Sequence, residues 1–195
     1  MSIVADGKSG ALPAGIDSDT YRDVLARFAT GVSVVTTLEN DDHGERQPWG
    51  TTVNSFTGLS LNPPLVLVAI GHERSIHPII ERLGRFAVNI LGENSQALSD
   101  CFAGAPSRLP REAFCNADYA IGDCGLPILA DAIAYVGCAV EQRIDAGDHT
   151  IYIGRVIETG TRDDSGWPLL YFRRRYLRIE RAETADLRGK PDRLR

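Results

Sequence analysis

Several features that would place a protein in a familiar class are missing from this sequence. No stretch approaches the ~18 consecutive apolar residues that a membrane span needs, and residues 1–15 lack the basic start and apolar middle of a secretory signal. No GxGxxG motif follows an apolar run, so a Rossmann-type nucleotide domain is not supported. We therefore expect a soluble, cytoplasmic protein with no membrane partner.

The sequence also has no excess of positive charge and no cysteine pair typical of a metal site. The net charge of −5 argues against a general nucleic-acid-binding surface. The four cysteines form no CxxC pair, so a zinc site is poorly supported, and in a reducing compartment we expect free thiols rather than disulfides. Cys101 and Cys138 are expected to pack as small apolar groups.

The chain has 195 residues and 43% hydrophobic content, which fits one globular domain. Residues 1–16 are rich in Gly, Ala, Ser and Pro and are predicted to form a flexible arm. The globular domain is predicted to span residues 17–180. Residues 181–195 are predicted to form a charged, solvated tail.

Apolar runs at short spacing, bounded by turn residues, predict a mainly β protein. The run LVLVAI at residues 65–70 is apolar throughout and is expected to be a central strand. The predicted strands are residues 32–38, 49–56, 65–70, 86–91, 132–144 and 151–159. Because only brief helices separate them, we expect an antiparallel barrel rather than alternating β-α units.

Helices are predicted at residues 17–30, 75–83 and 95–102. Asp17 can cap the first helix and Gly31 is expected to end it. Ser75 can cap the second helix, which Gly84 should end. The stretch that follows the third helix, up to residue 129, is rich in Pro and Gly and is a candidate lid or interface segment.

The stretch WGTTVNSFTGLS, residues 49–60, carries small polar side chains where a strand built only for packing would carry Val or Ile. Its hydroxyl and amide groups suit the polar edge of a heterocycle or a phosphate. On composition alone, a strand whose Thr and Ser residues face solvent explains the same pattern, because Thr is a good strand former. The candidate binding residues are Thr51, Thr52, Val53, Asn54 and Ser55.

Two further clusters have both a structural and a functional interpretation. The turn Gly147-Asp148-His149 holds a lone histidine, which in a hairpin is more often a solvated surface residue. Three consecutive arginines begin at Arg173 and are followed by Tyr176. They either discourage pairing of an edge strand, or one of them binds a phosphate while Tyr176 lines the pocket. Which arginine would do so is left open.

Seven motifs in this order give the chain a family resemblance between about residues 21 and 179. They are FATGVSVVTT, WGTTVNSF, LSLNPPLVLVAI, ERSIHPII, FAVNIL, GDHTIYIGRV and LLYFRRRY. Each is weak alone, but together they resemble the short-chain flavin reductases. These small flavin:NAD(P)H oxidoreductases are partners of flavin-dependent monooxygenases.

The resemblance implies an FMN-binding split β-barrel, an antiparallel Greek-key barrel with a few short helices. It also implies a homodimer that binds FMN or FAD near the subunit interface. In such proteins the segment matching residues 52–55 contacts the isoalloxazine and ribityl chain, and the segment matching Arg74 and Ser75 lies near the flavin phosphate. At a helix N-terminus, Ser75 would favour an anion, although simple capping explains it equally well.

The resemblance further implies that His149 lies near the nicotinamide, with Asp148 orienting its ring. Hydride passes directly from the nicotinamide to the flavin, so the cofactors carry the chemistry and His149 would position NADH or NADPH. The expected function is an NAD(P)H:flavin oxidoreductase that supplies reduced FMN or FAD to a separate monooxygenase. The alternative is a non-reductase flavin- or heme-binding module of the same barrel class, and a more distant one is an interaction protein without cofactor.

Overall fold

The computed structural model describes residues 15–40, 43–105, 111–162 and 166–179. Within these ranges the chain is mainly β, with three short α-helices and one 3-10 helix, which confirms the predicted fold class. The predicted arm and tail lie outside the described residues, apart from the exposed Gly15 and Ile16. None of the helices in the described ranges is long and apolar enough to cross a membrane.

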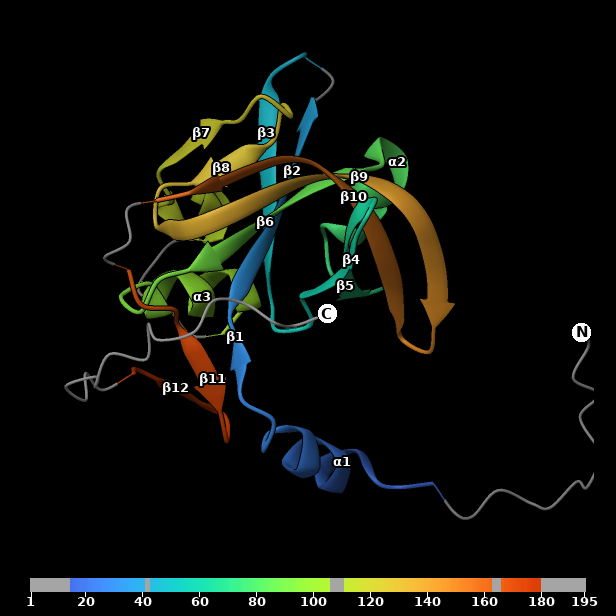
Figure 1. The fold of residues 1–195 in the computed structure, drawn as a ribbon, viewed down its shortest axis with the longest axis vertical. Helices are drawn as coiled ribbons and strands as arrows, with labels where there is room; N and C mark the ends of the chain where they lie inside the picture. Colours follow the sequence, from blue (N-terminus) through green and yellow to red (C-terminus); the bar gives the residue numbers. More distant parts are fainter. Residues whose placement is uncertain (1–14, 41–42, 106–110, 163–165, 180–195) are drawn as a thin grey trace, which may run out of the picture.

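The largest sheet has seven antiparallel strands in the order β3-β2-β6-β9-β10-β5-β4, and it is strongly curved (Figure 1). Its strands are β2 (Ser33–Asn40), β3 (Arg46–Val53), β4 (Thr57–Leu61), β5 (Pro64–Gly71), β6 (Arg85–Leu91), β9 (Ala132–Ala146) and β10 (His149–Thr161). The expectation that the LVLVAI strand is central is wrong, because β5 lies next to the edge strand β4. Only alternate residues of this strand, from Val66 to Ile70, are buried.

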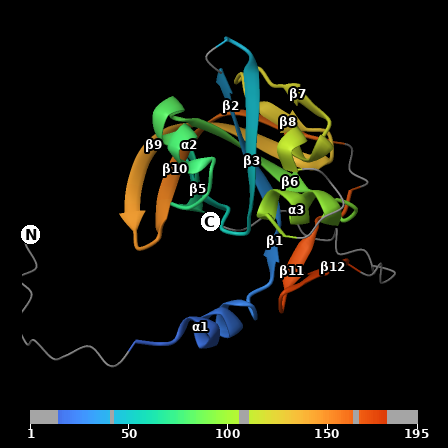
Figure 2. The same cartoon turned by 180° about the vertical axis from the view of Figure 1, so that it is seen from behind.

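The apolar sequence of β2 is explained by its burial on both faces of the sheet. Val34 packs into a core cluster with α3, and Val35 packs into a second cluster with α2. Seen from behind, α2 and α3 lie on opposite sides of the β2–β3 pair (Figure 2). The two buried threonines of β2 are satisfied, since Thr36 Oγ1 donates to Pro127 O (2.6 Å) and Thr37 Oγ1 donates to Arg85 O (2.9 Å).

Helix α1 (Ser18–Leu25) begins as predicted, with the Asp17 carboxylate accepting hydrogen bonds from the backbone N–H groups of Asp19 and Thr20. It ends at Leu25, so the expectation that Gly31 stops it is wrong. Gly31 instead belongs to β1 (Thr30–Gly31), which pairs with β11 (Leu170–Phe172). The helix stands apart from the main sheet (Figure 1) and none of its residues is buried.

Helices α2 (His77–Leu83) and α3 (Gln96–Ala103) lie close to the predicted ranges, and α2 ends at Gly84 with φ of 64°. The loop-rich stretch after α3 contains a 3-10 helix, η1 (Arg111–Asn116), and a hairpin of β7 (Tyr119–Ile121) and β8 (Pro127–Leu129). This stretch returns to α3, where Cys101 and Cys115 form a disulfide with a Cα–Cα distance of 6.0 Å. The expectation of free thiols is therefore wrong for this pair and holds only for the buried Cys124 and Cys138.

A small sheet in the order β1-β11-β12 completes the described fold, with β12 at Arg175–Leu177. Tyr171 and Tyr176, which face each other across the β11–β12 ladder, pack against the α3 core cluster. This sheet therefore brings Tyr176, which follows the three arginines, next to α3.

Candidate functional site

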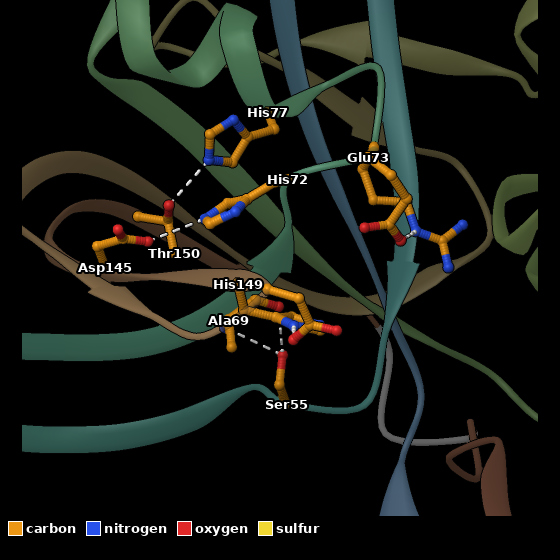
Figure 3. Close-up of polar contacts among 10 residues, drawn as sticks. Ser55, Ala69, His72, Glu73, His77, Asp145, His149 and Thr150 are labelled. Atoms are coloured by element: carbon orange, nitrogen blue, oxygen red, sulfur yellow. Dashed lines mark hydrogen bonds and ion pairs between the residues drawn. The ribbon is translucent and has the colours of Figure 1, made fainter. Parts of the chain in front are cut away.

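The polar segment identified from the sequence lies where the two edges of the large sheet meet. β3 and β4 are the two edge strands, and only residues 54–56 join them, so the sheet curls back on itself at this link. Ser55 fastens the link to β5: its Oγ donates to Ala69 O (2.9 Å) and accepts from Ala69 N (3.1 Å) (Figure 3). The Ser55 hydroxyl thus continues the β4–β5 ladder past Thr57, the first residue of β4.

Two of the five candidate residues, Thr52 and Ser55, use their hydroxyl groups in hydrogen bonds to other parts of the protein. Thr52 Oγ1 donates to the carbonyl of Ser99 in α3 (2.7 Å), and the Ser99 hydroxyl lies 2.9 Å from Tyr176 Oη. Thr51 is only 4% exposed. Thr52 and Ser55 therefore already use their hydroxyl protons in the fold, which the sequence did not reveal.

Asn54 is the polar side chain of this segment whose polar atoms remain accessible to a ligand. It is exposed, and no side-chain hydrogen bond joins it to any other described residue. It lines three separate cavities, of about 190, 430 and 520 Å³. The two larger volumes lie in the range of small-molecule sites, roughly 300–1,000 Å³. The amide of Asn54 therefore has both donors and its acceptor available to a ligand.

His149 faces the smallest of these cavities, together with residues 51–55, Gly71 and Arg74. It is the first residue of β10, and it pairs with Ala146 and Gly71 on the two neighbouring strands. The predicted loop of residues 145–149 is thus a tight turn, in which Gly147 has a φ of 68° that favours glycine. This register brings the histidine back over the start of the polar segment.

The Asp148 carboxylate lies 2.6 Å from His149 Nδ1. This hydrogen bond, followed by the charge of the imidazole, lowers the pKa of Asp148 below its ordinary value. A carboxylate on Nδ1 leaves Nε2 as the nitrogen that can face a ligand.

Two other histidines gather beside the tip of the β9–β10 hairpin (Figure 3). His72 Nε2 lies 3.1 Å from Asp145 Oδ1, and His77 Nε2 lies 2.9 Å from Thr150 Oγ1. Their spacing in the sequence gave no reason to expect this grouping.

Arg74 connects the His149 cavity with the 430 Å³ cavity, since it lines both. Its Nη1 donates to the carbonyl of Ala103 at the end of α3 (2.9 Å), and its Nε lies 3.2 Å from Glu73 Oε1. These contacts fix the guanidinium while leaving further N–H groups free for an anion.

Ser75 lines none of the three cavities that contain Asn54. It is exposed and lines a different cavity, beside Trp49 and Cys101. The expectation that it caps a helix is wrong, because α2 begins at His77 and its N-cap, Ile76, makes no side-chain hydrogen bond. The backbone first makes a turn, in which the N–H of His77 donates to Arg74 O (2.9 Å).

The C-terminal cluster is divided between two cavities. Tyr176 lines the 430 Å³ cavity with Asn54 and Arg74, and burial raises its pKa to about 12. Arg174 lines the same cavity, whereas Arg173 lines only an outer cavity of about 340 Å³ beside Arg27. Of the arginines at 173 and 174, only Arg174 thus lines the cavity that contains Asn54, Arg74 and Tyr176, a choice that the sequence left open.

Comparison with known proteins identifies the family. Residues 25–180 match the family model described as "Flavin reductase like domain". The chain is 39% identical over 165 residues to the "NADH-dependent flavin reductase StyB" of Pseudomonas fluorescens, covering 83% of this chain and 89% of that protein. It is 35% identical to the "Flavin-dependent monooxygenase, reductase subunit HsaB" of Rhodococcus jostii, covering 97% of this chain and 91% of the relative.

Solved structures agree with this result. "Flavin reductase PheA2 in native state" superposes with a TM-score of 0.75 at 34% identity, covering 85% of this chain and 99% of that chain. The Streptomyces globisporus "NADH:FAD oxidoreductase SgcE6 in complex with NAD and FAD fragments" superposes with a TM-score of 0.74 at 32% identity, covering 85% and 94%. The chain belongs to the flavin reductase-like domain family.

Proposed function

We propose that this chain binds a flavin against Asn54 at the link between β3 and β4, and binds NADH on the side of this link where His149 lies. The chain is a flavin reductase, an oxidoreductase that uses NADH to reduce FMN or FAD. Residues 17–180 form the proposed catalytic domain. The family match over residues 25–180 lies within it.

One observation carries the placement of the site. Asn54, Arg74 and His149 come from three different parts of the chain and line one cavity. An amide, a guanidinium and an imidazole supply donors and acceptors for a heterocycle edge, a phosphate and a second ring. This donor set fits a flavin and a nicotinamide nucleotide.

Different residues bind the flavin and orient the nicotinamide. Asn54 binds the polar edge of the flavin, Val53 and the backbone around it pack against the ring, and Arg74 binds the phosphate. His149 orients the nicotinamide through Nε2 while Asp148 holds Nδ1. When bound, the nicotinamide and the flavin supply the hydride transfer itself. The protein contributes mainly by bringing the two rings together in reactive orientation.

The partners follow the same reasoning. One relative is named as the reductase subunit of a flavin-dependent monooxygenase, and others as an NADH-dependent FAD reductase and an FMN reductase. We propose that this chain likewise uses NADH and hands reduced flavin to a separate monooxygenase. A cytoplasmic location, expected from the sequence, and a homodimer, implied by the family resemblance, remain part of this proposal.

Steady-state assays test the function directly. Purified protein is mixed with NADH or NADPH and with FMN, FAD or riboflavin, and the loss of reduced nicotinamide absorbance is followed. We expect rapid oxidation with NADH and at least one flavin. If no pair of substrates is turned over, the proposed function is wrong, and a flavin retained by the purified protein would then support the binding-module alternative.

A further inference from the structure

The turn between β11 and β12 carries two arginines in a backbone conformation that suits neither. Arg173 has a φ of 49° and Arg174 a φ of 59°, both in the left-handed region that glycine and asparagine adopt most readily. In a two-residue hairpin turn these positions favour Asn-Gly. A side chain kept at such a position at a conformational cost is a reason to look for a function.

The two arginines have different surroundings. The Arg173 guanidinium lies 5.2 Å from the centre of the Phe172 ring, and the side chain lines only the outer 340 Å³ cavity. Arg174 lines this outer cavity and also the 430 Å³ cavity that contains Asn54 and Arg74. Arg174 is therefore the residue shared by the proposed flavin site and the surface beyond it.

An ion pair holds Arg174 in this place. Its Nη2 lies 2.9 Å from Asp23 Oδ1 of helix α1. Both side chains are more than half exposed, at 54% and 72%, so the pair contributes little to stability. It does fix the direction of a guanidinium that has five N–H donors and uses one of its groups here. The remaining donors are available to a ligand.

The charges along the two cavities favour an extended anion. Among the described residues that line the 430 Å³ cavity, Arg74 and Arg174 are positive and Asp100 is negative. The outer cavity adds two more arginines and one acid, Asp23. A mononucleotide such as FMN has one phosphate, which Arg74 alone can bind. A dinucleotide has two linked phosphates, and the forked geometry of a second arginine suits the second one.

We propose that Arg174, together with Arg74, binds the diphosphate of FAD in the 430 Å³ cavity and so makes FAD the preferred flavin. This inference rests on the flavin site proposed above. NADH also has a diphosphate, but His149, the proposed nicotinamide contact, lines the 190 Å³ cavity and not the 430 Å³ cavity. Asp23 is then a positioning residue that holds the Arg174 side chain.

The test compares Arg174→Gly with Arg173→Gly. Both variants remove one positive charge from the same turn and relieve the same kind of backbone strain, so the melting temperature of each should rise by about 2–4 °C. Only Arg174→Gly should weaken FAD binding, by about tenfold, while FMN binding changes less than about twofold. Arg174→Asn, which also tolerates the left-handed conformation, should behave like Arg174→Gly.

Dissociation constants for FAD and FMN are measured by flavin fluorescence, and the ratio of the two constants in each variant tests the inference. An FAD-to-FMN ratio unchanged in Arg174→Gly, or changed equally in Arg173→Gly, would overturn the inference. A rise in the KM for NADH with both flavins, at an unchanged ratio, would assign the diphosphate to NADH and also overturn it. The wild-type protein serves as the separate control, because failure to oxidise NADH with any flavin would refute the proposed function instead.

Discussion

Asn54 and Ser55 are neighbours in the sequence, yet the structure gives them opposite roles. Ser55 uses its hydroxyl to fasten the β3–β4 link to Ala69, whereas Asn54 is exposed and open. We therefore expect Ser55→Ala to lower stability, and Asn54→Ala to lower flavin affinity. The two single substitutions act as controls for each other, because each removes polar atoms from the same three-residue link.

The magnitudes follow from the contacts. Ser55→Ala removes two neutral hydrogen bonds, each worth about 0.5–1.5 kcal/mol, and the half-buried position puts the total at about 1–2 kcal/mol. At roughly 2–4 °C per kcal/mol, the melting temperature should fall by about 2–8 °C. Asn54→Ala should change stability by less than about 0.5 kcal/mol. It should cost about 1 kcal/mol of flavin binding, roughly fivefold in Kd.

Two measurements on each variant are sufficient. Urea or thermal unfolding gives the change in the free energy of unfolding, and titration with flavin, followed by fluorescence quenching, gives Kd. If Asn54→Ala binds FMN and FAD as well as the wild type does, the link between β3 and β4 is not the flavin site. If Ser55→Ala loses flavin affinity at full stability, the division of roles between the two residues is wrong.

Three further predictions follow from other parts of the structure. His149→Ala should raise the KM for NADH and slow hydride transfer while flavin Kd is unchanged, and unaltered steady-state kinetics would contradict its assignment. Gly50→Ala would place a Cβ 2.5 Å from a ring carbon of the buried Phe102, so it should cost about 1–3 kcal/mol of stability, and an unchanged melting temperature would refute this close packing. Burial raises the pKa of the Cys124 and Cys138 thiols to about 11 and about 12, so at neutral pH both stay protonated and an alkylating reagent should not label them in the native protein. After unfolding, mass spectrometry should find two labelled thiols without reductant and four with it, and four without reductant would contradict the disulfide.

The sequence predicted those elements whose signals are local. Asp17 caps α1 and Gly84 ends α2, because capping and the left-handed conformation depend on one or two residues. The β-branched run of β2 and the apolar run of β6 also became strands. The end of α1 was wrong, since the pairing of Gly31 with β11 is a contact between residues far apart in the chain.

The same distinction, between local signals and contacts far apart in the chain, explains which features of the site could be predicted. The types of residue at 51–55 indicated polar contacts, but not whether the partner was a ligand or the protein. Thr52 and Ser55 find their partners in α3 and β5, and this depends on how the sheet curls. Cys101 and Cys115 meet because the chain after α3 turns back. In the same way, no sequence signal separates Arg174 from Arg173, since it is the hairpin turn that lets Arg174, and not Arg173, reach the 430 Å³ cavity.

The Ala69 amide gives the Ser55 contact a further consequence. Its proton is held by a side-chain oxygen rather than by a neighbouring strand, so it exchanges with solvent only when the β3–β4 link separates from β5. Its hydrogen–deuterium exchange rate therefore reports how often this part of the sheet opens. A ligand that bridges the link and β5 should slow exchange at this amide more than in the middle of the β6–β9 ladder. One backbone proton would thus give a local measure of occupancy that needs neither turnover nor a coloured cofactor.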